Sequence, residues 1–389
     1  MAQGPSIPDE RYAARLASAQ ELTAERGVRA LLVGVGADLR YLTGYVAPPL
    51  ERLTMLVIPA RERPVLLAPR LEAMAAADCA VARSGHVDVV AWDETDDPPA
   101  LVAAILDRAL GGIIRPGEQV LVSDRLWAMH VLGLQRTLPG PSMGLATAIL
   151  RDLRMAKDAD EVELLRLAAH AADRVIDQIA AGRLVGRTER DVSAEIRTRL
   201  LAEGHDAADF AIVASGPNSA SPHHEADDRV IEAGEPIVVD IGGAWSGYYS
   251  DTTRTLWVTG GRPELGPTAE FRALFDTLQA AQAAATAAVR PGIACEAIDA
   301  TARDLIAADG HGDEFIHRVG HGIGLEVHEE PYLVGGNAEP LREGVAFSVE
   351  PGIYVAGRHG ARIEDIVVCG PDGPDVLNVS SHDLRVVAG

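Results

Sequence analysis

The chain of 389 residues is 47% hydrophobic and carries a formal net charge of −22. This negative charge disfavours nucleic acid and anionic membranes as partners, and no apolar run is long enough to span a bilayer. Three scattered cysteines and the lack of an apolar signal core in residues 1–20 favour reduced thiols and a cytoplasmic location. A chain of this length is expected to form two domains.

The first part of the chain alternates predicted strands and helices. Periodicity predicts helices at residues 8–26, 71–77 and 99–110 and strands at residues 28–34, 54–58, 65–68 and 119–122. Such alternation is typical of a small α/β domain. The segment LPGPSMG at residues 138–144 is rich in turn formers, which marks the border region between the two domains. We therefore expect domains at residues 1–150 and 151–389.

The second part opens with a predicted helix that starts at a capping box, in which Asp158 precedes Glu161 by three residues. A second helix is predicted at residues 188–201. Residues 186–205 around it are similar to residues 292–311, at a constant offset of 106. We interpret this repeat as two related halves, each a helix followed by a hairpin. Chance similarity of two amphipathic helices that end in glycine is the alternative.

An acidic hairpin is predicted at residues 237–258. A β-branched run at residues 237–241 is followed by the turn signal Ser246-Gly247 and by a return strand at residues 248–258. With a two-residue turn, facing residue numbers sum to 493, so Asp240 faces Thr253. Asp251 lies two residues from that partner, and residues two apart on a strand share a face. Both carboxylates are expected on one side, whereas a one-residue bulge would place them on opposite faces.

A second acidic hairpin is predicted from strands at residues 346–355 and 361–369, joined by a polar loop at residues 356–360. Glu350 and Glu364 are equally far from Gly357 in this loop, which places them on a common face. Arg362 lies two residues before Glu364 and shares its face. We therefore expect Arg362 to orient a carboxylate of the site from behind.

These hairpins and one glycine-flanked histidine supply a set of metal-ligand side chains: Asp240, Asp251, His321, Glu350 and Glu364. Four carboxylates are more negative charge than apolar strands gather without a cation to balance it. One acidic hairpin alone would be better explained by solvated carboxylates on an outer face, but two such hairpins with His321 favour a site for two divalent metal ions. This ligand set favours Mn, with Co, Fe or Zn as alternatives.

At these residues the chain resembles the metal-dependent aminopeptidase superfamily with the pita-bread fold, on the proline-specific branch that includes prolidase and aminopeptidase P. The similar motifs run in the family's order from Ser215 to Asp365: SGPNSASPHH, VVDIGG, SDTTRT, GHGIGLEVHEEP, SVEPGIY and RIED. The resemblance implies an α/β (α+β) protein with an N-terminal creatinase/prolidase-type domain, a C-terminal pita-bread catalytic domain and homodimeric assembly. It also assigns the five side chains above as the metal ligands.

The activity implied by the resemblance is hydrolysis of small peptides with proline at the second position, by a hydroxide that bridges the two metal ions. Glu350 would carry a proton from the water to the leaving amine, His328 would stabilise the tetrahedral intermediate, and His223 would contact the substrate backbone. Apart from the resemblance, His223 and His328 are better explained as structural or surface residues. His224 is interpreted as a bystander.

Two other functions stay open on the sequence. One is a dinuclear-metal hydrolase of the same fold that acts on a different bond. The other is a non-catalytic binding protein, which the intact set of five ligands disfavours. Within the proline-specific branch, the sequence leaves the choice between a dipeptidase and an aminopeptidase open.

Overall fold

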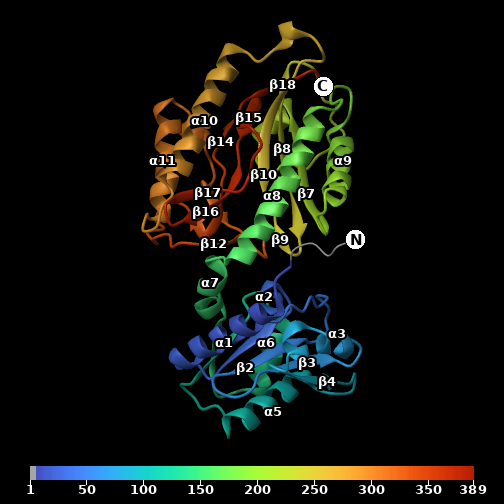
Figure 1. Cartoon of the computed structure of the whole chain (residues 1–389), viewed down its shortest axis with the longest axis vertical. Helices are drawn as coiled ribbons and strands as arrows, with labels where there is room; N and C mark the ends of the chain where they lie inside the picture. Colours follow the sequence, from blue (N-terminus) through green and yellow to red (C-terminus); the bar gives the residue numbers. More distant parts are fainter. Residues whose placement is uncertain (1–5) are drawn as a thin grey trace. The chain divides into compact units, whose positions relative to one another are not determined.

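The computed structural model describes residues 6–389, and these divide into two compact units (Figure 1). The first is Ile7–Arg154, and the second is Met155–Gly389 together with Ser6. Each unit has its own sheet system and its own buried apolar cluster. In this described range, no helix is both long and apolar enough to cross a membrane.

The first unit is built on one mixed sheet of six strands in the order β4-β3-β2-β1-β5-β6. The strands are β1 (Ala30–Gly34), β2 (Met55–Pro59), β3 (Val65–Pro69), β4 (Asp88–Trp92), β5 (Gln119–Val122) and β6 (Ser142–Leu145). The helices are α1 (Asp9–Glu25), α2 (Ala37–Thr43), α3 (Ala73–Ala77), α4 (Ala80–Arg83), α5 (Pro98–Leu110), α6 (Ala128–Thr137) and α7 (Thr147–Met155). The central strands β1 and β2 are buried along their whole length, as expected for apolar runs covered on both faces.

The predicted helices and strands of this unit are confirmed to within about three residues at their ends. The prediction of turns throughout residues 138–144 is partly wrong, because the last residues of this segment form the edge strand β6, parallel to β5. Gly144 makes this pairing possible: a Cβ there would lie 2.8 Å from the side chains of Gln119 and Leu121. This strand depends on a partner more than 20 residues away, so turn composition alone does not predict it.

The second unit contains two larger sheets and a two-stranded ribbon. The first sheet has the order β18-β10-β8-β7, with β9 on β8: β7 (Ala207–Ser215), β8 (Glu235–Trp245), β9 (Tyr248–Tyr249), β10 (Thr252–Val258) and β18 (Arg385–Val387). The second has the order β12-β11-β13-β16-β17: β11 (Gly320–Gly322), β12 (Glu329–Leu333), β13 (Ala346–Val349), β16 (Asp365–Gly370) and β17 (Gly373–Val376). The ribbon pairs β14 (Gly352–Val355) with β15 (His359–Arg362).

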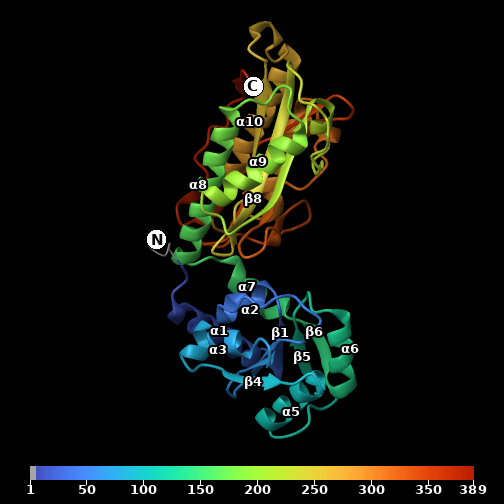
Figure 2. The same ribbon diagram turned by 90° about the vertical axis from the view of Figure 1, so that its right-hand side faces the viewer.

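Four long helices cover these strands from two sides: α8 (Ala159–Ala180), α9 (Glu189–Ala202), α10 (Ala269–Ala288) and α11 (Cys295–Ala308). Short 3₁₀ turns are η1 (Gly216–Ala220), η2 (Pro263–Leu265) and η3 (Gly312–Glu314). Figure 1 shows α10 and α11 on one side of the strands and α9 on the other, and Figure 2 shows α8 and α9 on the near side of the strands. Each helix pair shares an apolar cluster with the sheet that it covers. The predicted capping box of α8 is confirmed by two reciprocal 3.0 Å hydrogen bonds between Asp158 and Glu161.

The two halves of this unit repeat the same pattern. Helices α9 and α11 begin and end at the same offset of 106 residues, as the sequence repeat predicts. Further on, Gly234 and Gly344 both have positive φ, 94° and 84°, and stand 110 residues apart just before the strands β8 and β13. Asp240 and Glu350 follow at this same offset of 110. The interpretation as two related halves is therefore confirmed, and the two carboxylates hold equivalent positions in them.

Candidate active site

The first acidic hairpin has the register that the sequence predicts. Trp245 pairs with Tyr248 and Asp240 pairs with Thr253, so the facing residue numbers sum to 493 throughout. Ser246 and Gly247 both have positive φ, 47° and 86°, which is typical of a two-residue hairpin turn whose twist matches its strands. The return strand is interrupted just before Thr252 without a change of register.

A buried histidine supports this interruption. Ser250 precedes Asp251, is fully buried, and has its Oγ 2.9 Å from His205 Nε2. His205 Nδ1 donates to the carbonyl of Leu200, which leaves Nε2 to accept from the Ser250 hydroxyl. The Gly243 amide donates to the same hydroxyl oxygen. These bonds fix the backbone just before Asp251.

The free energy of unfolding of the protein is expected to depend on pH through His205. Burial lowers the pKa of His205 from 6.5 to about 4, so between these values the unfolded chain takes up a proton that the folded chain does not. Stability is therefore lost as the pH falls through this window, by roughly 2 kcal/mol at pH 5. Urea unfolding of metal-free protein at pH 7 and pH 5 measures this. His205→Gln should lack this part of the pH dependence, whereas His86→Gln, at an exposed position, should retain it.

The second acidic hairpin also keeps its predicted register. Pairs in β13–β16 and β14–β15 both sum to 714, the value for Glu350 and Glu364. The strands break at these two glutamates, whose backbone amides donate instead to the carbonyls of Val319 and Thr253. The predicted loop at residues 356–360 is too long, because Val355 pairs with His359 and the turn closes in three residues with Gly357 at φ 72°.

The two hairpins meet through Thr253 and Glu364. The Glu364 amide donates to the Thr253 carbonyl at 3.1 Å, and the Thr253 hydroxyl donates to Glu364 Oε2 at 2.7 Å. This contact joins residues 111 positions apart in the chain. It brings the acidic ends of the two halves together.

All eight residues singled out in the sequence line one pocket of about 150 Å³: His223, Asp240, Asp251, His321, His328, Glu350, Arg362 and Glu364. Phe210, Ile212 and Val327 add an apolar wall. Two overlapping groups could each hold one metal ion, with their ligand atoms within 4.8 Å of one another. One group is Asp240, Asp251 and Glu364, and the other is His321, Glu350 and Glu364. The two groups share Glu364.

The electrostatics of the pocket fit a cation. Asp240 Oδ1 is buried and has no hydrogen-bond partner in the described part of the chain. Burial, together with the neighbouring Asp240 and Glu350, raises the pKa of Asp251 well above its ordinary value. Burial and the neighbouring carboxylates likewise raise the pKa of Glu364. Such shifts mean that the ionised carboxylates are insufficiently compensated by the protein, and a bound divalent ion would supply the missing positive charge.

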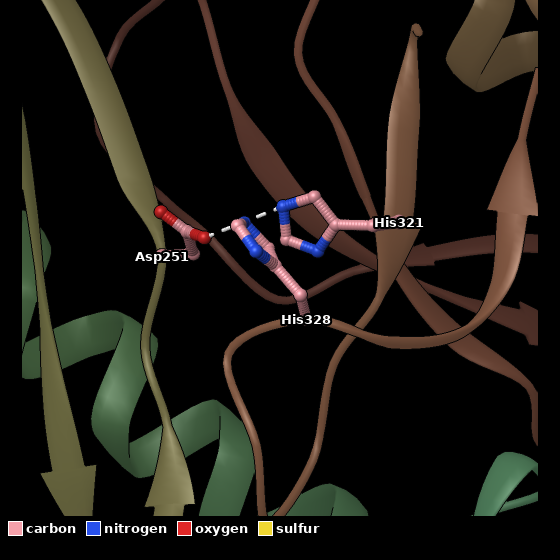
Figure 3. A group of neighbouring side chains, drawn as sticks. All are labelled: Asp251, His321 and His328. Carbon is pink, nitrogen blue, oxygen red and sulfur yellow. Dashed lines mark ion pairs between the residues drawn. The ribbon is translucent and has the colours of Figure 1, made fainter. Parts of the chain in front are cut away.

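His321 presents one ring nitrogen to these carboxylates. Its Nδ1 donates to the Gly322 carbonyl at 3.2 Å, which leaves Nε2 free to act as a ligand atom. Nε2 lies 3.1 Å from Glu350 Oε1 and 3.6 Å from Asp251 Oδ2, as Figure 3 shows for the latter. When Nε2 carries a proton and no metal ion, it donates to Glu350 instead. Although burial opposes it, this hydrogen bond and the positive charge of the ring then lower the pKa of Glu350 to about 2.

Ser348 holds His321 and Glu350 in this arrangement, a role that the sequence analysis missed. The Ser348 hydroxyl accepts from the His321 amide and donates to Glu350 Oε1, both at 3.1 Å. Gly320 is packed against the same residue, since a Cβ there would lie 1.9 Å from the Ser348 carbonyl. Ser348 lies two residues before Glu350 on the predicted strand. Because residues two apart on a strand share a face, this spacing could have predicted that Ser348 contacts Glu350.

Arg362 lines the pocket and contacts one of the four carboxylates directly. It donates to Asp240 Oδ2 at 2.5 Å and to the Thr253 hydroxyl at 3.0 Å, and that hydroxyl donates to Glu364. A further bond joins it to the Tyr354 hydroxyl at 2.9 Å. Arg362 thus orients Asp240 directly and Glu364 through Thr253.

The two other histidines lie at the open side of the pocket, and both are exposed. His328 stands on a loop with its ring 4.1 Å from that of His321, and Figure 3 shows it turned toward Asp251 and His321. The ring of His328 is partly enclosed by the pocket although the residue as a whole is exposed. This partial burial, together with the charge of His321, lowers the pKa of His328 to about 4. Next to His223, His224 is tied to the buried Glu189 at 2.7 Å. This contact anchors the loop that carries His223, so His224 has a structural partner.

Comparison with known proteins agrees with this geometry. Residues 163–371 match metallopeptidase family M24, and residues 15–156 match the creatinase/prolidase N-terminal domain. The chain is 46% identical to a probable dipeptidase PepE of Mycobacterium tuberculosis, with 97% of each chain covered. It is 32% identical to an Xaa-Pro dipeptidase of Lactobacillus helveticus, with 90% of this chain and 92% of the relative covered.

Solved structures give the same result. A crystal structure of dipeptidase PepE from Mycobacterium ulcerans is 46% identical, with a TM-score of 0.90 over 98% of this chain and 99% of that one. A recombinant prolidase from Thermococcus sibiricus is 33% identical, with a TM-score of 0.88 over 98% of this chain and 100% of that one. The chain therefore belongs to metallopeptidase family M24, with a creatinase/prolidase-type N-terminal domain and a pita-bread catalytic domain.

Proposed function

We propose that this metallopeptidase hydrolyses Xaa-Pro bonds in small peptides and uses two divalent metal ions. The observation that carries the proposal is the pair of overlapping ligand groups that share Glu364 at the floor of one pocket. The relatives named dipeptidase and Xaa-Pro dipeptidase support a dipeptide substrate.

The ligands of one ion would be Asp240, Asp251 and Glu364, and those of the other His321, Glu350 and Glu364. Two divalent ions held there would lower the pKa of a water molecule and polarise the scissile carbonyl. Carboxylate oxygens in the majority suit Mn, and the single imidazole is compatible with Co, Fe or Zn.

The protein's own groups would then handle the proton and the substrate. Glu350 would take the proton of the attacking water on its carboxylate and pass it to the leaving amine. His328, at the pocket rim, would donate to the oxygen on which negative charge develops. His223 would contact the substrate backbone, and the apolar wall formed by Phe210, Ile212 and Val327 would exclude water from the bound peptide.

A substrate panel tests this proposal. Purified protein reconstituted with Mn is expected to hydrolyse Ala-Pro, to cleave Ala-Pro-Ala poorly, and to leave Ala-Ala and a phosphotriester largely intact. Chelation should abolish the activity, and added Mn should restore it. Faster turnover of the phosphotriester or of Ala-Ala than of Ala-Pro would instead indicate a hydrolase of the same fold with another bond specificity.

Metal analysis separates the enzyme from a non-catalytic binding protein. We expect two ions per chain after reconstitution, together with turnover of Ala-Pro. Folded protein that retains fewer ions and cleaves no member of the panel would contradict both the ligand assignment and the proposed function.

A further inference from the structure

A buried ion pair lies directly behind the loop that carries His328. Lys157 Nζ is 2.5 Å from Glu329 Oε1, and the exposed fractions of the two side chains are 1% and 8%. Their residues are 172 positions apart in the chain. Separating the two groups would leave an uncompensated charge in the interior, which is strongly unfavourable, so the two side chains are held together.

The backbone holds Lys157 firmly in place. Its amide donates to the Gly344 carbonyl at 2.8 Å, and the preceding Ala156 forms a bridge with Val345. The next residue, Asp158, caps α8. Lys157 therefore projects from a fixed point between the start of the second acidic hairpin and the first long helix of the unit.

The loop from Ile323 to His328 is packed closely around this ion pair. A Cβ on Gly324 would lie 2.5 Å from Glu329 Oε1 and 3.0 Å from Lys157 Nζ. The Gly324 carbonyl accepts from the Tyr249 amide at 2.9 Å, which ties the loop to the first acidic hairpin. Only a residue without a side chain allows the backbone to pass so close to the two charges.

Glu329 and His328 are neighbours, and their side chains make separate contacts. His328 is the last residue of the loop and Glu329 is the first residue of β12. Glu329 is turned toward Lys157, while His328 is turned toward Asp251 and His321 (Figure 3). Because His328 directly precedes Glu329, holding Glu329 against Lys157 limits the positions that the His328 backbone can adopt. The pairing of β11 with β12 is irregular at this point, because its register shifts between His321 and Gly322, where Gly322 pairs with Glu329. The ion pair therefore supports a segment whose strand pairing is interrupted.

We propose that Lys157 is a positioning residue for His328, acting through its buried ion pair with Glu329. This inference rests on the proposed role of His328 in catalysis. Without the ion pair, the Glu329 side chain would no longer be held against the loop, and the neighbouring His328 would sample more orientations. His328 would then spend less time within reach of the reacting oxygen, although neither Lys157 nor Glu329 touches substrate.

The experiment is a mutant cycle on holoenzyme reconstituted with Mn. The pair is removed as Lys157→Met with Glu329→Gln, so that no lone charge stays buried, alone and combined with His328→Ala. We expect kcat for Ala-Pro to fall about 10–100-fold in the paired variant, with KM within about twofold and two ions still bound. In the His328→Ala variant, the same change should lower kcat by less than about twofold, because the side chain that the ion pair positions has already been removed.

If removal of the ion pair lowered kcat by the same factor with and without His328→Ala, the proposal would be overturned. Such a result would show a general structural effect unrelated to His328. The matched control is the more exposed ion pair of the same unit, Arg166 and Asp375, replaced as Arg166→Met with Asp375→Asn. It is expected to leave kcat unchanged. Should the paired variant fail to fold, Lys157→Arg keeps the charge but displaces the carboxylate, and the same cycle with His328→Ala applies.

A readout independent of turnover separates this inference from the proposed function. In histidine side-chain NMR spectra of the folded protein, the paired variant should shift or broaden the ring signals of His328 and leave those of His223 unchanged. Unchanged His328 signals would overturn the positioning role even in an active enzyme. Altered His328 signals in a protein that cleaves no Xaa-Pro peptide would support it while the proposed function failed.

Discussion

Replacing Glu364 by Gln is expected to lower kcat for Ala-Pro by roughly 10³-fold or more. Glu364 is the one carboxylate that both candidate ligand groups share, so its loss weakens both ion positions at once. Several kcal/mol of metal-derived transition-state stabilisation depend on those ions, and each 1.36 kcal/mol corresponds to a tenfold change in rate. Steady-state kinetics and metal content of the reconstituted variant measure the effect.

The same variant should fold without metal at least as well as the unmodified chain. The pKa of Glu364 is raised by burial and by neighbouring carboxylates, so its ionised form is unfavourable in the metal-free protein. A neutral amide of the same size removes this repulsion. Thermal unfolding in the presence of a chelator checks this, with Glu343→Gln at an exposed position as the control. Near-normal turnover with two bound ions would remove Glu364 from the ligand set.

Replacing Arg362 by Met is expected to destabilise the metal-free protein by about 3–5 kcal/mol, the usual cost of breaking a buried ion pair. Arg362 is buried, and its guanidinium binds Asp240, the Thr253 hydroxyl and the Tyr354 hydroxyl at the same time. Without it, the Asp240 carboxylate is left without its cation and Thr253 loses the donor that orients it toward Glu364. Metal affinity and activity should each fall about 10–100-fold.

Arg362→Lys is the matched control for charge. A lysine keeps the positive charge but cannot place separate donors toward Asp240, Thr253 and Tyr354 at once. We expect its stability to lie between those of the unmodified chain and Arg362→Met, with most of the loss in metal affinity retained. Urea unfolding and titration with Mn provide the two measurements. Full metal affinity in Arg362→Lys would show that charge, and not the forked geometry, is what the site requires.

Local signals determined the registers of the two hairpins. The turn Ser246-Gly247 and the period of two were enough to place Asp240 opposite Thr253, and symmetry about Gly357 gave the relation between Glu350 and Glu364. The capping box at Asp158 is also a local pattern, and the repeat of α9 in α11 can be recognised by comparing the two segments of the sequence directly. In each case the interacting residues are near one another in the chain, or the signal depends on backbone geometry alone.

Local signals failed where a distant partner decides the conformation. The strand β6 forms because Gly144 lets β5 pack against it, although its sequence has turn composition. The loop of the second hairpin closes earlier than its polar residues suggest, because His359 pairs with Val355 and the Gly360 amide donates to the Ser219 hydroxyl. Tertiary hydrogen bonds outweighed local composition in both segments.

The sequence by itself determined the chemical types at the site and the faces on which Asp240, Asp251, Glu350 and Glu364 lie. Tertiary structure alone decided that the two hairpins join through Thr253 and Glu364, that Arg362 binds Asp240, and that Lys157 reaches Glu329. The physical reason is that strand periodicity and turn geometry are properties of short segments. These three contacts join residues more than 100 positions apart, and the packing of two helix-covered sheets against each other sets their distances.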